Sequence, residues 1–311
     1  MNKKNSFTCP VCHTTDNSFY IKTKALMHEE NKEIYNFNLC NLCETVFLTN
    51  PVSISTLSSY YTDNYLPYKG ALAWGKYSSF VEKSQRNLDL SRLKIIKKIL
   101  SKTGTESSIL DVACGNPSFL EIVKQKLNLN TTGIDFSDLG WQNKNFSALK
   151  LIKVAIEDFQ TNELFDVITL WHYLEHDYNP QKTIEKLHQL LKSGGKIVIE
   201  VPDYKSITAR KQKECWQGWH SPRHISLFSK KSFDVLFDSE KWKIVEHKRH
   251  GTLDAFTLWW LGKMEQQNIN WSQNMETHLF KLVFLKIVTF PFFVLKSFFP
   301  LGIQILIVEK K

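Results

Sequence analysis

The chain has 311 residues, which at about 150 residues per domain suggests two units, one of them with a large core. It is 42% hydrophobic and 23% charged, with only 12 Gly and 9 Pro, and this composition excludes collagen-like and broadly disordered chains. The net charge of +9 favours an anionic partner such as nucleic acid, a phosphorylated substrate or an acidic membrane, unless it reflects only a lysine-rich genome. The first residues lack the apolar core of a secretory signal, which predicts a cytoplasmic protein.

Four of the six cysteines form two Cys-x-x-Cys pairs near the N-terminus, Cys9 with Cys12 and Cys40 with Cys43. In a reducing compartment such pairs are typical of metal ligands, and four thiolates suit the tetrahedral geometry of structural zinc. Short β-like runs lie between the pairs, and a unit this small needs a metal to complete its fold. Residues 1–50 are therefore predicted to form a zinc ribbon. A redox pair and a ribbon that has lost its metal are the alternatives.

Residues 51–105 are predicted to be an aromatic linker followed by a helix. The aromatic side chains form either the wall of a substrate pocket or a packing surface between domains. From Phe80 to Leu100 the apolar residues recur at helical spacing, which predicts a helix that leads into the main domain.

Strand-length apolar runs then alternate with helical patterns over residues 106–251. This alternation predicts a doubly wound α/β domain, in which helices cover both faces of a parallel sheet. The expected strands are 108–112, 131–134, 151–155, 165–171 and 196–201, with helices at 117–127 and 180–191. A helix at 230–238, a strand at 242–247 and a last strand within 302–311 follow.

The turn after the first of these strands predicts a ligand site. The run Ile109–Pro117 (ILDVACGNP) passes from a buried strand through small residues into a helix, so a ligand can approach the backbone and the amides at the helix start. Asp135 ends the next strand, where an acidic residue can accept hydrogen bonds from both ribose hydroxyls of an adenosine-containing cofactor. The Gly-x-Gly-x-x-Gly spacing of nicotinamide-binding domains is absent.

With IEDF (156–159) after the third strand and FDVITLWHYLEH (165–176) in and after the fourth, the chain resembles class I S-adenosylmethionine-dependent methyltransferases. It is most similar to the branch of the ubiquinone-biosynthesis O-methyltransferases, over residues 80–250 and the last strand. The resemblance implies a seven-stranded Rossmann-like sheet and S-adenosylmethionine as cofactor. The cofactor residues that it implies are Asp111, Ala113 and Gly115 in the first loop, Asp135 and Phe136 at the ribose, Ile156, Glu157 and Asp158 around the adenine, and Trp171 facing the methionine portion. The chain departs from the family's first loop, since Ala113 and Pro117 replace two of its glycines.

Histidines are the candidate bases for methyl transfer to a nucleophile that carries a proton. His172 and His176 follow the fourth strand, and His220 and His224 lie in GWHSPRHISLFS after the fifth. Each is a candidate base or a residue that positions the acceptor. The Glu175-His176 pair resembles a Leu-Glu-His element of the family whose role could equally be structural. A second metal site made from these histidines and Glu175 is a weaker alternative.

Residues 252–301 form a helical insertion before the last strand. They contain a long apolar tract, 279–299, in which no uninterrupted run reaches the roughly 20 apolar residues of a spanning helix, so the tract is expected not to cross a membrane. The interrupting residues are Lys281, Lys286, Pro291 and Lys296. The lysines share one side of a helix at about 100° per residue, which predicts a kinked amphipathic helix. Such a helix either lies in an anionic membrane interface or packs on protein as a lid or dimer contact.

Together these patterns predict a methyltransferase that acts on a hydroxyl oxygen of a small or lipid-linked acceptor, such as a sugar of a glycan. An RNA methyltransferase that binds through the ribbon is one alternative, but basic and acidic residues balance in 1–50, which disfavours nucleic acid. A module that binds the cofactor without turnover is another. The expected location is the cytoplasm, with peripheral contact to the inner face of the membrane through 279–299. The patterns do not predict an oligomeric state.

Overall fold

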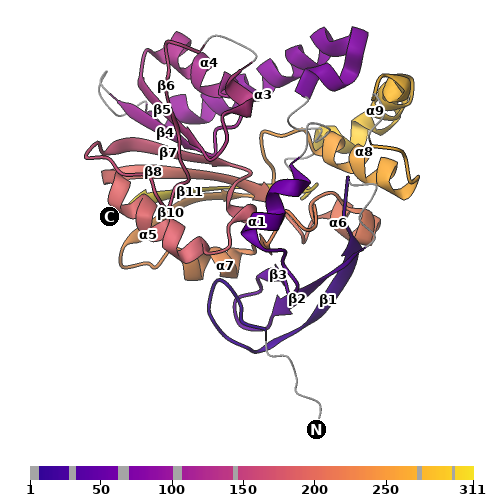
Figure 1. The fold of residues 1–311 in the computed structure, drawn as a ribbon, viewed down its shortest axis with the longest axis horizontal. Helices are drawn as coiled ribbons and strands as arrows, with labels where there is room; N and C mark the ends of the chain where they lie inside the picture. Colours follow the sequence, from indigo (N-terminus) through magenta and orange to yellow (C-terminus); the bar gives the residue numbers. More distant parts are fainter. Residues whose placement is uncertain are drawn as a thin grey trace.

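The computed structural model describes residues 7–27, 33–61, 70–100, 107–142, 146–271, 275–295 and 298–311. Within these residues the chain forms two sheets, a four-stranded sheet near the N-terminus and a seven-stranded sheet at the centre of the main domain (Figure 1). A helical insertion lies between β10 and β11, the last two strands of the main sheet.

The main sheet has the strand order β10-β11-β8-β7-β4-β5-β6. The five strands from β8 to β6 are parallel, and β11 is antiparallel to both of its neighbours. The strands are β4 (Ser108–Val112), β5 (Asn130–Asp135), β6 (Lys150–Lys153), β7 (Phe165–Trp171), β8 (Leu191–Pro202), β10 (Trp242–Lys248) and β11 (Ile303–Lys310). Each strand expected from the sequence has a counterpart, so the predicted doubly wound α/β sheet is confirmed.

Helices cover both faces of the main sheet (Figure 1). On one face lie α3 (Ser78–Leu100) and α4 (Ser118–Leu127), and on the other α5 (Pro180–Leu190) and α7 (Lys230–Leu236). Successive residues of β4 point to opposite faces, because side chains alternate along a strand. Ile109 packs with the residues of α3 and α4, whereas Leu110 packs with those of α5 and α7. Burial on both faces explains why the strands are nearly continuous apolar runs.

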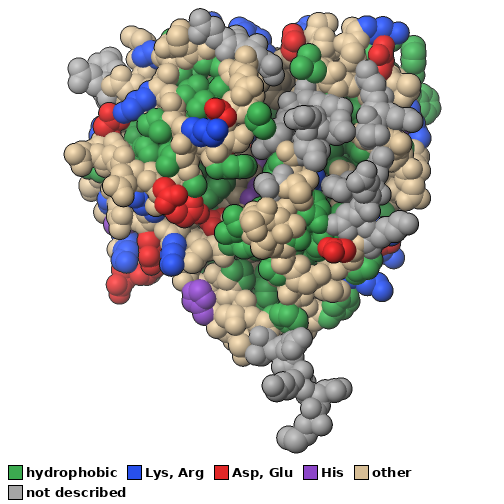
Figure 2. Space-filling model, viewed as in Figure 1, with side chains coloured by type: hydrophobic (Ala, Val, Ile, Leu, Met, Phe, Trp, Pro, Cys, Tyr) green, Lys and Arg blue, Asp and Glu red, His purple; other side chains and the backbone are tan. Residues whose placement is uncertain are grey.

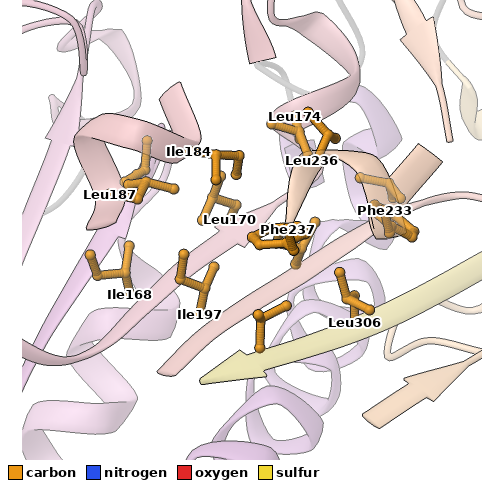
Figure 3. Packing of buried hydrophobic residues seen from close by; sticks show 14 of the residues in the cluster. Ile168, Leu170, Leu174, Ile184, Leu187, Ile197, Phe233, Leu236, Phe237 and Leu306 are labelled. Atoms are coloured by element: carbon orange, nitrogen blue, oxygen red, sulfur yellow. The ribbon is translucent and has the colours of Figure 1, made fainter. Parts of the chain in front are cut away.

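The core between β7 and α5 is built from branched aliphatic side chains (Figure 3). Ile168 and Leu170 of β7 belong to one buried cluster with Ile184 and Leu187 of α5. All four side chains are buried. This packing fixes β7 against its helix, and therefore fixes the loop after β7, from which the candidate site residues project.

The N-terminal sheet has the order β1-β2-β3-β9. Its first three strands are β1 (Asn17–Lys24), β2 (Ile34–Cys40) and β3 (Val46–Leu48). The fourth, β9 (Ser226–Leu227), comes from the main domain and pairs with β3 through Val46 and Phe47. The ribbon is therefore joined by backbone pairing to the segment that directly follows His224.

The remaining helices lie to one side of the main sheet (Figure 1). The linker contains α1 (Ile54–Leu57), and α6 (Ile207–Gln212) follows β8. The insertion contains α8 (Ala255–Gln266) and α9 (Leu279–Val294), with Pro291 inside α9. The sequence predicts a helix at 279–299 that includes Lys296, but Lys296 lies outside the described residues.

Candidate active site and zinc site

The four predicted zinc ligands lie together at the turns of the ribbon. Their Sγ atoms are all within 4.8 Å of one another. Cys9 Sγ lies 3.6 Å from Cys43 Sγ, and Cys12 Sγ lies 3.4 Å from Cys40 Sγ. Zinc–sulfur bonds of about 2.3 Å in a tetrahedron place the sulfur atoms about 3.8 Å apart. The cluster therefore fits one structural zinc ion.

The surroundings of the cysteines favour a metal over free thiolates. Burial raises the pKa of Cys12 to about 11, and the hydrogen bond with Cys9 together with burial raises the pKa of Cys43 well above its usual range. Without a cation the thiols would stay protonated, whereas zinc stabilises the thiolates. His13, the residue after Cys12, is bonded through Nε2 to Gln181 at 2.6 Å and is not part of the cluster.

The predicted residues of the first cofactor loop meet at the carboxyl edge of the parallel strands. Asp135 Oδ2 accepts a hydrogen bond from the Gly115 amide at 2.8 Å, and Oδ1 accepts one from the Ser137 amide at 2.9 Å. Ala113 and Gly115 have φ angles of 55° and 49°, in the left-handed region that favours glycine. Ala113 accepts some strain there because it is small. A Cβ added at Gly115 would meet no described atom within 4 Å, so this side of the loop is open to a ligand.

Asp111 and Trp171 lie deeper at the same edge. Asp111 is buried and accepts a hydrogen bond from Thr169 Oγ1 at 2.6 Å, while burial raises its pKa to about 7. The Arg92 guanidinium lies 4.6 Å from the centre of the Trp171 ring. Trp171 Nε1 is buried and has no hydrogen-bond partner among the described residues. A buried donor without a partner is costly, so this position suits a polar group of a bound cofactor.

The other residues expected around the adenine and ribose lie at the end of β6 and after β5. Ile156 is buried, whereas Glu157 and Asp158 are exposed. Phe136 is 56% exposed, and its ring meets that of Tyr61 edge-on at 6.2 Å between centroids. The exposed side chains of Phe136, Glu157 and Asp158 therefore form a solvent-accessible rim after β5 and β6, whereas Ile156 is covered.

If Asp135 accepts the ribose hydroxyls, Asp135→Ala is expected to weaken binding of S-adenosylhomocysteine by about 1.5 to 3 kcal/mol, the contribution of a charged hydrogen-bond partner. Titration calorimetry measures this difference. Asp138→Ala is the matched control, because the Asp138 side chain is half-exposed and pairs with Lys153 at 2.9 Å on the surface. Equal affinities of wild type and Asp135→Ala, with both chains folded, would remove Asp135 from the cofactor site.

His172 lies between two buried carboxylates. Its Nδ1 is 3.2 Å from Glu175 Oε1 and its Nε2 is 3.0 Å from Glu200 Oε1. Burial opposes the charge, but the two carboxylates outweigh it and raise the pKa of His172 to about 9. The imidazolium in turn lowers the pKa of Glu200 to about 2 against the effect of burial. His172 is therefore protonated near neutral pH and has no lone pair for a proton, so its geometry suits positioning rather than base catalysis.

His176 has the opposite electrostatic environment. Burial lowers its pKa below the usual value, so the ring is neutral near pH 7. Its Nδ1 lies 3.1 Å from the Arg223 carbonyl oxygen and 3.2 Å from Tyr61 Oη. An Nδ1–H that donates to the carbonyl leaves Nε2 with a free lone pair. Because Tyr61 also contacts Phe136, His176 is linked to the rim of the cofactor site.

His220 and His224 are also neutral, since burial lowers the pKa of each well below its usual value. The His224 ring lies 4.5 Å from that of His176 and its Nδ1 lies 2.8 Å from the Gly218 carbonyl oxygen. Glu175, His176 and His224 each offer a metal-ligand atom within 4.8 Å of the others. Glu175, however, already pairs with the His172 imidazolium.

The structure adds site residues that the sequence patterns did not identify. Tyr61 was only one of many linker aromatics, and Arg92 was one cation on a helix. Glu200 had a detectable signal, because it is a single carboxylate inside the apolar run IVIEVP. A charged side chain at the buried end of a central strand needs a partner, and here His172 is that partner.

Residues 82–247, more than half of the chain, match the family described as "Methyltransferase domain". The chain belongs to this methyltransferase family. Its four-cysteine cluster fits structural zinc.

Two curated relatives of this methyltransferase are named ubiquinone biosynthesis O-methyltransferase. The protein from Saccharophagus degradans is 33% identical over 100 residues, which cover 30% of this chain and 42% of the relative. The protein from Nitrosomonas europaea is 28% identical over 130 residues, which cover 39% of this chain and 54% of the relative. The chain thus spans about half the length of the curated relatives it matches.

Among solved structures, the plantazolicin methyltransferase BpumL, in complex with a monoazolic desmethylPZN analog and S-adenosylhomocysteine, is 19% identical with a TM-score of 0.47. That likeness covers 78% of this methyltransferase and 95% of BpumL. The N-methyltransferase NodS from Bradyrhizobium japonicum is 14% identical with a TM-score of 0.41, over 72% of this chain and 87% of NodS.

Proposed function

We propose that this methyltransferase transfers the methyl group of S-adenosylmethionine to a hydroxyl oxygen of a small or lipid-linked acceptor, such as a sugar of a glycan. The protonation state of His176 is the observation that carries the proposal. Its imidazole is neutral and partly exposed, and it lies at the edge where the predicted cofactor residues meet. A hydroxyl needs such a base, because its oxygen becomes a good nucleophile only as its proton leaves. The names of both curated relatives also point to oxygen.

In this proposal the bound cofactor supplies an electrophilic methyl group on a sulfonium centre. His176 Nε2 would accept the proton of the acceptor hydroxyl and so leave its oxygen able to take the methyl group that the cofactor supplies. The Arg223 carbonyl holds the ring in the required tautomer through Nδ1–H. The Tyr61 hydroxyl, 3.2 Å from Nδ1, supports the same orientation.

His172 positions the residues around it through its positive charge. Its imidazolium compensates Glu175 and Glu200, and Glu200 also accepts hydrogen bonds from the Thr252 amide at 2.6 Å and the Thr252 hydroxyl at 2.8 Å. This network ties the loop after β7 to the start of the insertion. It holds His176 and the insertion in a fixed relation to the cofactor edge.

The proposal is tested by comparing methylated molecules in cells with and without this protein. We expect one class of small-molecule, glycan or lipid to lose a methyl ether, which fragmentation in a mass spectrometer distinguishes from an N-methyl group. Complementation with His176→Ala should fail to restore the product. A missing methyl group on nitrogen would contradict the hydroxyl acceptor, and one on RNA would contradict the small or lipid-linked acceptor, while membership of the methyltransferase family would be unaffected.

A further inference from the structure

Helix α9 turns its most apolar side away from the protein. Large apolar side chains are exposed along the helix and just beyond it, and we call this set the α9 face: Phe280, Val283, Phe284, Ile287, Val288, Phe290, Phe292, Val294, Leu295, Phe298 and Phe299. The exposed fractions reach 82% for Phe280 and 69% for Ile287. In Figure 2 hydrophobic side chains lie at the upper right edge of the molecule, where Figure 1 places α9. A continuous apolar surface of this kind normally has a partner.

The opposite side of α9 is fixed to α8. The buried Phe293 ring lies 5.5 Å from Phe256 and 5.7 Å from Trp259, measured between ring centroids. Lys286 Nζ pairs with Asp254 Oδ2 at 2.8 Å. Because these contacts hold the helix from one side, the outward direction of the α9 face is set by packing.

The charges of α9 lie at the borders of this face. At about 100° per residue, Lys281 and Lys286 stand about 100° and 120° to either side of Phe280. The helix sequence LFKLVFLKIVTFPFFV contains no carboxylate. An apolar face flanked by lysines is the pattern of a helix that lies in a membrane interface, with its apolar side chains among the acyl chains and its ammonium groups at anionic headgroups.

By length and composition, the 20 residues Met275–Val294 are sufficient to span a bilayer, contrary to the expectation from the sequence that the tract does not cross a membrane. That expectation counted each lysine as an interruption, whereas the last 18 residues of this helix carry only two charges, Lys281 and Lys286. The pair Lys286–Asp254 and the packing of Phe293 nevertheless keep α9 along the surface of the domain. A helix held in this way lies parallel to a membrane that touches its outer face.

We propose that the α9 face docks this methyltransferase onto a membrane that contains anionic lipid. The charge of the chain, +9, matches such a surface. The docked face is close to the candidate site, since Asp254 follows directly after Thr252 and Leu253, whose amides donate to Glu200. Lys286 contacts this Asp254, so a membrane under α9 lies near the loop that carries His172 and His176. This inference concerns membrane binding and does not depend on the identity of the methyl acceptor.

Flotation of the full chain in a density gradient tests the proposal. Vesicles of phosphatidylcholine alone are compared with vesicles that also contain phosphatidylglycerol. The wild type is expected to float with the anionic vesicles and less with the neutral ones. The double variant Phe284→Glu/Ile287→Glu should reduce flotation at least about tenfold, because two large apolar side chains no longer enter the lipid. Lys281→Glu should reduce it on anionic vesicles only.

The matched control is Ile54→Glu on α1, because Ile54 is 72% exposed and lies outside the insertion. This variant should float like the wild type. The double variant and Ile54→Glu both replace exposed side chains, so circular dichroism should show the same helix content for each as for the wild type. The proposal is overturned if the wild type does not float, or if the double variant floats as well as the wild type. A wild-type dimer that the double variant converts to a monomer, without flotation of either, would assign the α9 face to a second copy of the chain.

Discussion

Replacing Cys40 by Ser is expected to remove the zinc ion and unfold the ribbon. Structural zinc contributes about 10 to 16 kcal/mol of apparent binding free energy to small modules, which is more than a marginally stable domain can lose. The effect should extend to the main domain, because β3 pairs with β9 and the Cys43 carbonyl accepts hydrogen bonds from Ser229 and Ser232 at 3.2 Å and 3.1 Å.

Elemental analysis of purified, reduced protein measures the first part of this prediction. We expect about one zinc ion per chain in the wild type and almost none in Cys40→Ser. Limited proteolysis should then cut the first 50 residues of the variant, or of chelated wild type, before the main domain. Cys215→Ser is the control, since Cys215 lies outside the cluster. Wild-type protein without stoichiometric metal would refute the zinc site.

Replacing His176 by Ala is expected to lower kcat by about 10²- to 10⁴-fold, the usual contribution of a positioned base. Affinity for S-adenosylhomocysteine should stay unchanged, because the ring is needed for the proton and not for the cofactor. His188→Ala is the control, since His188 lies on α5 and its ring packs on Trp242. If kcat is unchanged in His176→Ala, another group accepts the proton.

The pH dependence distinguishes a base from a structural histidine. A base must be neutral to accept a proton, so activity should fall as the pH falls through the pKa of His176. Burial lowers this pKa, which places the acidic limb below about 6.5, the usual pKa of a histidine. His172 does not produce this limb, because its pKa is about 9 and it stays protonated throughout. Rate profiles that keep the same acidic limb in His176→Ala would indicate a structural role for this residue.

The features that the sequence predicts well are those encoded locally. Parallel strands buried on both faces are apolar runs between turn residues, so β4, β5, β7 and β8 could be found from such runs alone. The zinc site could be predicted from the cysteine pairs for the same reason, because each Cys-x-x-Cys turn is one short motif. Gly115 and Asp135 could be predicted to lie close together because they follow or end neighbouring parallel strands. The carboxyl ends of such strands meet at one edge of the sheet.

The features that sequence did not predict depend on contacts between distant segments. No local pattern indicates that Ser226–Leu227 completes the sheet of the ribbon, or that Tyr61 reaches His176 across the domain. The charge of His172 depends on Glu200, which follows it by a full helix and strand. Periodicity predicted that 279–299 contains a helix with lysines on one side. Only the packing of Phe293 decides which side of that helix faces outward.

Transfer of a labelled methyl group is the most direct test of the central claim, that this chain uses S-adenosylmethionine at the edge formed by β4, β5 and β7. Purified wild type is incubated with methyl-labelled S-adenosylmethionine and an extract of cells that lack the protein. We expect label in an extractable small molecule, glycan or lipid together with an equal amount of S-adenosylhomocysteine, and much less of both with Asp135→Ala or His176→Ala under the same conditions. Wild-type protein that binds S-adenosylhomocysteine and yet transfers no label to any fraction would contradict the account and leave a module that binds the cofactor without turnover.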